Sequence, residues 1–80
     1  MTHCLKTIQP WFDHVAEGTK TFELRKNDRG FKIGDRLFLQ EWDEIRERYT
    51  GREIEVIVRG TMERFAGLCE GFILLMIERR

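Results

Sequence analysis

A lysine, a glutamate and an arginine lie close together in the segment GTKTFELRKND, residues 18–28. Lys20 carries a compact positive charge, Glu23 a carboxylate and Arg25 a planar guanidinium group; we call these three residues the ionisable triplet. On a strand Glu23 and Arg25 would share one face, about 7 Å apart. The triplet could bind a phosphate or a base edge, or stabilise an oxyanion with Glu23 as general base. It could also be an exposed ion pair worth about 0–1 kcal/mol.

Large aromatic residues occur near the ends of the neighbouring predicted elements. Trp11, Trp42 and Tyr49 could stack an unpaired base, because single-stranded nucleic acid is bound by aromatic faces next to Lys or Arg. A second interpretation of Trp11 and Trp42, as core residues, stays open. The predicted ligand site consists of Lys20, Glu23, Arg25, Lys26, Trp42, Tyr49 and Trp11.

The composition predicts one small globular domain over residues 1–80. The chain contains 14 basic and 14 acidic residues, so any attraction to nucleic acid must come from a local surface. No apolar run is long enough to cross a bilayer, and no secretory pattern occurs. We therefore expect a cytoplasmic protein without membrane contact, either a monomer or a weak homodimer.

The two cysteines, Cys4 and Cys69, match no disulfide or metal-ligand spacing, and we expect both to be reduced and partly buried. A zinc site would require His3, Cys4, His14 and Cys69 to converge, but the adjacent His3 and Cys4 would point to opposite faces of a strand. We expect no metal and no cofactor, and His14 is expected to lie on the surface.

Apolar periodicity predicts a mainly β fold with one short helix. Pro10 and Gly18 suit the start of a two-turn helix and the position just after it. Trp11, Phe12 and Val15 would form the buried face of this helix. Five short strands in a chain of this size close most economically as a small barrel beside the helix. The helix is expected at residues 10–17 and the strands at residues 3–8, 19–26, 36–42, 52–59 and 72–77.

The alternation within each strand predicts which side chains are buried. In the second strand Phe22 and Leu24 are expected to face the core, so that Glu23 and Arg25 face away from it. The last strand is apolar on both faces and is expected to be central and buried. Two segments are expected to be irregular: residues 43–51, a loop or frayed helical turn, and residues 60–71, a strand end with a turn or short helix packed on the core.

The pattern G-x-K-x-x-E-x-R at residues 18–25 resembles the signature of ASCH domains. The resemblance continues through RKNDRGFKIGDRLFLQEWD, YTGREIEVIV and GFILLMIE, with Gly34 and Asp35 just before the third strand, and it covers nearly the whole chain. It is greatest to short bacterial and phage proteins. It implies a PUA-like fold, that is, a small β-barrel of about five strands with one or two short helices. It also implies a cleft containing the ionisable triplet and a ligand that is RNA or a modified nucleoside.

One branch of that superfamily hydrolyses acetylated cytidine with a K-x-x-T arrangement and a later glutamate. Lys20 matches the lysine, but Glu23 occupies the threonine position, so the nucleophile is missing. The later glutamate has no clear counterpart, although Glu63 and Glu70 lie in the corresponding region. The sequence therefore favours a non-catalytic module that binds RNA or a nucleotide. The alternatives are a small amidohydrolase in which the ionisable triplet is catalytic, and a protein-interaction module.

Overall fold

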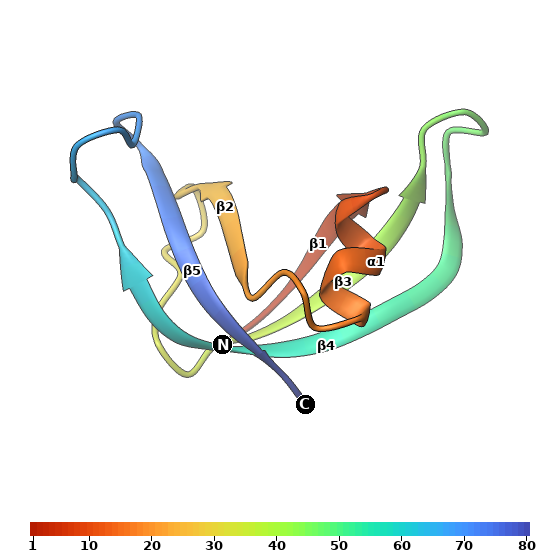
Figure 1. Cartoon of the computed structure of the whole chain (residues 1–80), viewed down its shortest axis with the longest axis horizontal. Coiled ribbons are helices and arrows are strands. Elements are labelled where there is room, and N and C mark those ends of the chain that lie inside the picture. The colour runs from red at the N-terminus through yellow and green to blue at the C-terminus, as the bar shows by residue number, and fades with distance from the viewer.

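One curled sheet and one short helix make up the computed structural model, which describes residues 1–80 (Figure 1). The strands lie in the order β1-β3-β4-β5-β2, with β1 parallel to β3 and every other neighbouring pair antiparallel. The prediction of a mainly β fold with one helix is confirmed, and the sheet is a five-stranded half-barrel. The elements are β1 (Thr2–Ile8), α1 (Trp11–Ala16), β2 (Phe22–Lys26), β3 (Arg36–Asp43), β4 (Arg48–Met62) and β5 (Phe72–Arg79).

The 15-residue strand β4 produces the curvature of the sheet. It pairs with β3 along one part of its length and with β5 along the other, and Figure 1 shows it running along the base of the half-barrel. The register shifts between Gln40 and Trp42 on β3, and between Val58 and Gly60 on β4. Such irregularities bend a strand and increase its twist. The sheet therefore curls until its two edge strands, β1 and β2, face each other.

Arginine side chains connect these two edges in place of a backbone ladder. Arg25 Nη2 donates a hydrogen bond to the carbonyl oxygen of Lys6 at 2.9 Å, and Arg29 Nη1 donates to that of Cys4 at 2.9 Å. Arg25 belongs to β2, and Arg29 lies in the turn that follows this strand. We call the gap between β1 and this segment, which the two residues bridge, the seam. Because no strand fills the seam, the barrel stays open on this side.

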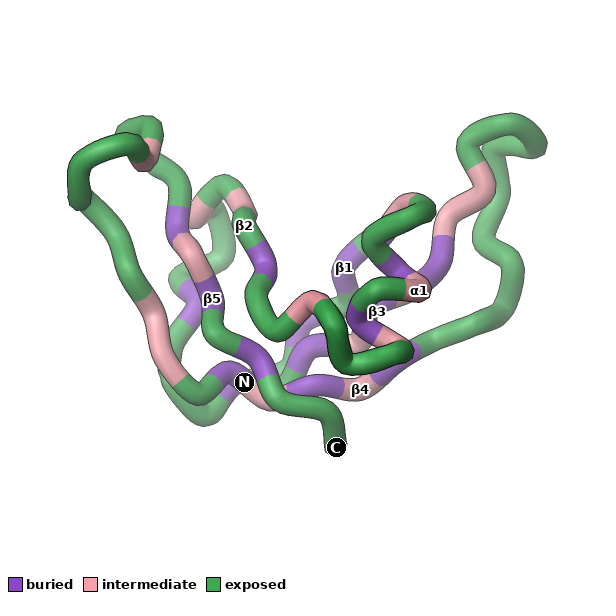
Figure 2. The backbone as a smooth tube through the Cα atoms, viewed as in Figure 1, coloured by how far each residue is buried: buried purple, intermediate pink, exposed green.

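The hydrophobic core lies on the inner face of the sheet, where alternate residues of β3, β4 and β5 are buried (Figure 2). Helix α1 adds Phe12 and Val15 to it, and His14 is exposed, as predicted. The expectation that Trp11 is buried with them is wrong, because 49% of its surface is exposed. The core comprises Leu5, Phe12, Val15, Phe31, Leu37, Leu39, Ile54, Val56, Val58, Ile73, Leu75 and Ile77.

Strand β2 faces the opposite way from the prediction. Glu23 is buried, with 3% of its surface exposed, whereas Phe22 and Leu24 are 45% and 51% exposed. Glu23 lies beside the buried Leu75 of β5 in the ladder, so both point to the inner face. A two-residue period shows that the faces of a strand differ, but not which face is inside.

Strand β5 is buried on one face only, contrary to the prediction of a strand buried on both. Ile73, Leu75 and Ile77 are buried, whereas Phe72 and Met76 are exposed. The outer face of β5 and β2 is exposed because no other element packs on it. A strand with apolar residues on both faces therefore does not have to be sandwiched between layers.

Three further expectations are wrong. Residues 48–51 belong to β4 rather than to a loop, because Trp42 pairs with Tyr49 and Asp43 with Arg48 in a hairpin. In residues 60–71 the predicted strand end and turn are confirmed, since β4 continues to Met62 and residues 63–71 form turns, but this segment is mostly exposed rather than packed on the core. Both cysteines are free thiols and are exposed rather than partly buried.

No helix in the structure has the length and apolar character needed to span a membrane.

A buried polar cluster connects β1 to the turn before β3. The carboxylate of Asp35 accepts hydrogen bonds from His3 Nε2 at 2.9 Å, from the backbone N–H of Lys32 at 3.1 Å and from the Met1 amino group at 3.1 Å. Gly34 precedes it with φ of 93°, a conformation that favours glycine. Burial alone would raise the pKa of Asp35, but these hydrogen bonds lower that pKa below its ordinary value of 3.8.

The lowered pKa of Asp35 predicts how stability depends on pH. Because the folded-state pKa lies below the unfolded-state value, this carboxylate contributes stability that is present above about pH 4 and is lost as pH falls through the folded-state pKa. In Asp35→Asn this titration is absent. We expect the free energy of unfolding, measured with urea from pH 7 to pH 2.5, to fall more steeply below pH 4 in the wild type than in Asp35→Asn. Parallel curves would contradict this assignment.

The orientation of β2 and β5 can be tested with two leucines on opposite faces. Leu75→Ala is expected to reduce the free energy of unfolding by about 2–4 kcal/mol, because it leaves a cavity in the core. Leu24→Ala removes a half-exposed side chain and should cost less than about 1 kcal/mol. Urea denaturation of both variants measures the difference, and equal losses would show that the faces are assigned wrongly.

Candidate functional site

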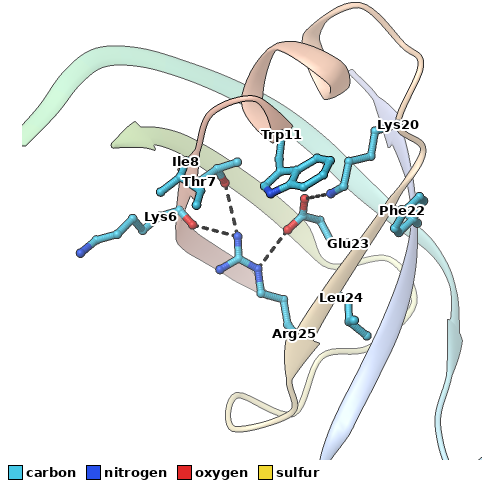
Figure 3. A pocket seen from close by; sticks show the side chains of 9 residues that line it. All are labelled: Lys6, Thr7, Ile8, Trp11, Lys20, Phe22, Glu23, Leu24 and Arg25. Atoms are coloured by element: carbon cyan, nitrogen blue, oxygen red, sulfur yellow. Dashed lines mark hydrogen bonds and ion pairs between the residues drawn. The ribbon is translucent and has the colours of Figure 1, made fainter. Parts of the chain in front are cut away.

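The ionisable triplet converges beside the seam (Figure 3). Lys20 Nζ lies 2.7 Å from Glu23 Oε1, and Arg25 Nε lies 3.0 Å from Glu23 Oε2. Each carboxylate oxygen therefore accepts a hydrogen bond from a different cation. The carboxylate is almost completely buried, whereas parts of Lys20 and Arg25 remain accessible to solvent. A buried carboxylate is tolerated here because both of its oxygens are paired.

The link between α1 and β2 positions these side chains. Gly18 takes φ of 83°, and the backbone N–H of Lys20 donates to the carbonyl oxygen of His14 at 3.0 Å. The chain is thus held against the last turn of the helix where it enters β2. From that point the alternation of the strand places Glu23 and Arg25 on the inner face, towards β1 and α1.

A pocket of about 490 Å³ lies over the triplet, within the usual size range of small-molecule sites. It lies between β1 and β2 below α1 (Figure 3), and the exposed indole of Trp11 forms part of its wall. Four of its nine residues are hydrophobic. The pocket is lined by Lys6, Thr7, Ile8, Trp11, Lys20, Phe22, Glu23, Leu24 and Arg25.

The two cations of the triplet keep hydrogen-bond donors that the fold does not use. Arg25 Nη2 donates to the carbonyl oxygen of Lys6 at 2.9 Å and to Thr7 Oγ1 at 3.3 Å, but Arg25 Nη1 makes no hydrogen bond. Lys20 Nζ has three N–H groups and uses one for Glu23. The pocket therefore combines free cationic donors with an accessible aromatic wall.

The comparisons with known proteins identify the family. The family described as "Domain of unknown function (DUF3850)" matches residues 2–77. The chain belongs to this family. It is also similar to the "Uncharacterized 12.9 kDa protein in GpA 3'region" of Escherichia phage P2, with 36% identity over 73 residues. The matched region is 91% of this chain but 64% of the phage protein, so this DUF3850 chain spans less than two thirds of that relative's length.

Of the residues predicted to bind a ligand, this DUF3850 structure brings the triplet and Trp11 together in one pocket. It places Trp42 and Tyr49 elsewhere, in edge-to-face contact with ring centroids 4.9 Å apart. Trp42 borders a separate hollow of about 320 Å³. Lys26 lines a smaller cavity of about 170 Å³ on the other side of Arg25.

The β1 residues that line the pocket were not among the predicted ligand-binding residues. Thr7 is buried and accepts the hydrogen bond from Arg25 Nη2. Lys6 lines the pocket, but its side chain points away from the triplet (Figure 3), and its Nζ lies 3.9 Å from the centroid of the Trp42 ring. The alternation of residues 3–8 showed that Thr7 and Lys6 lie on opposite faces. It gave no sign that β1 and β2 face each other.

A third buried carboxylate, Glu41 on β3, does not line this pocket. It accepts a hydrogen bond from Thr50 Oγ1 at 2.7 Å and another from the side-chain amide of Gln9. Arg52 Nη1 lies 3.5 Å from the same carboxylate, so its charge is balanced within the fold. Glu41 connects the β3–β4 hairpin to the segment before α1, which is a structural role.

Proposed function

We propose that the pocket binds a nucleotide unit, either as a free nucleotide or within single-stranded RNA. The observation that carries this proposal is one pocket that combines free cationic donors with an exposed indole. Arg25 Nη1 and the unused N–H groups of Lys20 would bind phosphate, and Trp11 would stack against the base. A simple anion site would not need the aromatic wall, and a purely apolar ligand would not need the cations.

We also assign the chain to the PUA-like ASCH group. The G-x-K-x-x-E-x-R pattern at residues 18–25 and the five-stranded half-barrel with one helix support this assignment. The resemblance implies RNA or a modified nucleoside as ligand, in agreement with the chemistry of the pocket. Much of that agreement is an analogy between folds, so the residues of the pocket carry more weight.

Hydrolysis of a modified nucleoside is less well supported. A general base must be reached by a water molecule, but the Glu23 carboxylate is almost completely buried and each of its oxygens already accepts a hydrogen bond from a cation. Thr7 Oγ1, the hydroxyl group that lines the pocket, accepts a hydrogen bond from Arg25 and has no base beside it. Thr21 lies outside this pocket. The geometry therefore suits binding better than nucleophilic catalysis.

A protein-interaction surface is a second candidate function. The exposed side chains of Phe22 and Met76 are neighbours in the β2–β5 ladder, and Phe72 and Leu24 extend the same outer face. Contiguous exposed apolar side chains often mark a binding surface. Because Phe22 and Leu24 also line the pocket, a partner bound to this outer face would adjoin the proposed nucleotide site.

Nucleotide binding can be tested by NMR titration of the protein with the four ribonucleoside monophosphates and a short single-stranded RNA at low salt. We expect saturable shifts of the Trp11 indole N–H and the Arg25 Nε–H. Trp11→Ala should weaken binding about fivefold or more, because stacking on one aromatic side chain contributes about 1–3 kcal/mol per base.

The matched control is Tyr49→Ala, because Tyr49 is 50% exposed, close to the 49% of Trp11, but lies outside the pocket. This variant should bind as the wild type does. Lys20→Ala is expected to weaken binding, and Lys32→Ala, which removes an exposed lysine elsewhere, should not. Absence of shifts with every ligand, or equal weakening by Trp11→Ala and Tyr49→Ala, would refute the proposed function.

A further inference from the structure

A second basic cavity adjoins the pocket along the seam. Its volume is about 170 Å³, and Arg25 lines both hollows. Four of its six residues are charged, three of them positively. The cavity is therefore smaller than the pocket and suits a compact anion better than a second base. It is lined by Leu5, Arg25, Lys26, Asp28, Arg29 and Phe31.

Lys26 and Arg29 have no carboxylate partner, which sets them apart from many cations of this chain. On β3 and β4, Arg36 pairs with Glu55 and Arg59 with Glu78. The structure contains no ion pair to Lys26 or Arg29. Asp28 is the one acidic residue that lines the cavity, against three cations, so the seam is locally positive although the whole chain has zero formal net charge.

The edge of β1 determines the spacing of the two arginines. Arg25 donates to the carbonyl oxygen of Lys6 and Arg29 to that of Cys4. These carbonyl groups are two residues apart on one strand, so they are separated by about 7 Å. That separation is similar to the distance between successive phosphates in an extended single strand. Arg29 uses only Nη1 in this contact, which leaves its other N–H groups available to an anion.

We propose that the seam binds a single-stranded polynucleotide rather than a free nucleotide. One nucleotide occupies the pocket, and the phosphate of the adjacent nucleotide enters the smaller cavity, where Lys26 and Arg29 contact it. This inference rests on the proposed function of the pocket and adds to it the neighbouring phosphate. RNA and DNA share the phosphate that this cavity would bind, so the contact requires a phosphodiester chain and does not depend on the sugar.

The test compares uridine monophosphate with a uridine tetranucleotide, by calorimetry or NMR. The wild type should bind the tetranucleotide at least about tenfold more tightly, because it makes about two additional cationic contacts. Lys26→Ala/Arg29→Ala should abolish most of this advantage and leave the affinity for the monophosphate nearly unchanged. The dependence of log K on log salt for the tetranucleotide should also become shallower, by about 0.7 for each phosphate that the variant no longer neutralises.

Lys32→Ala/Arg48→Ala is the matched control, because it removes the same charge from two exposed residues that have no carboxylate partner and lie outside both hollows. It should retain the advantage of the tetranucleotide. If Arg29→Ala impairs folding, Lys26→Ala alone tests the site, since the Lys26 side chain makes no hydrogen bond, and about a threefold loss is expected.

The possible outcomes separate this inference from the proposed function. Binding of the monophosphate without a gain for the tetranucleotide overturns the inference and leaves the proposed function standing, whereas failure of both ligands to bind overturns both. Equal losses in the two double variants would show general charge attraction and overturn the second site. Lys26→Ala/Arg29→Ala should weaken binding of a thymidine tetranucleotide as much as it weakens binding of the uridine tetranucleotide. A loss of affinity for only one of these two ligands overturns the phosphate assignment.

Discussion

The bridging of a buried carboxylate by two cations is the interaction on which the rest of this structure depends. Removing a carboxylate from water is costly unless its oxygens are paired, and Lys20 and Arg25 each pair with one oxygen of Glu23. This arrangement turns Glu23 towards the core and, by the alternation of a strand, turns Phe22 and Leu24 to the outer face. It also directs Arg25 across the seam to β1.

The seam explains why this half-barrel has a pocket. If β1 and β2 formed a backbone ladder, the strands would lie about 4.8 Å apart and a nucleotide would not fit between them. Arg25 and Arg29 instead hold the edges together through long side chains that end on carbonyl oxygens of β1. The same two guanidinium groups bridge the open side of the half-barrel and retain free N–H groups, so a structural contact also places donors for a ligand.

The sequence predicted the elements and the convergence of the triplet more reliably than the faces of the strands. Period-two alternation located β1, β2, β3 and β5 closely. For β2, hydropathy favoured Phe22 and Leu24 as core residues. Glu23 is buried instead because two cations pair with its carboxylate, and a hydropathy pattern carries no information about such pairing. Trp42 and Tyr49 pair with each other in the β3–β4 hairpin and lie outside the pocket, and residues 48–51 of that hairpin were predicted as irregular. Thr7 lines the pocket because the edge strands β1 and β2 face each other, and local sequence patterns do not predict which strands face each other.

The most direct test of the bridge is the free energy of unfolding of Glu23→Gln compared with that of Glu78→Gln, measured by urea denaturation at neutral pH. Glu78 is matched to Glu23 because it also contacts an arginine, Arg59, at 3.2 Å, but both groups of that pair are largely exposed. Glu23→Gln should lower the free energy of unfolding by about 2–4 kcal/mol, because Lys20 and Arg25 lose a buried charged partner. Glu78→Gln should lower it by less than about 1 kcal/mol. Equal, small losses in the two variants would show that the Glu23 bridge does not organise the fold.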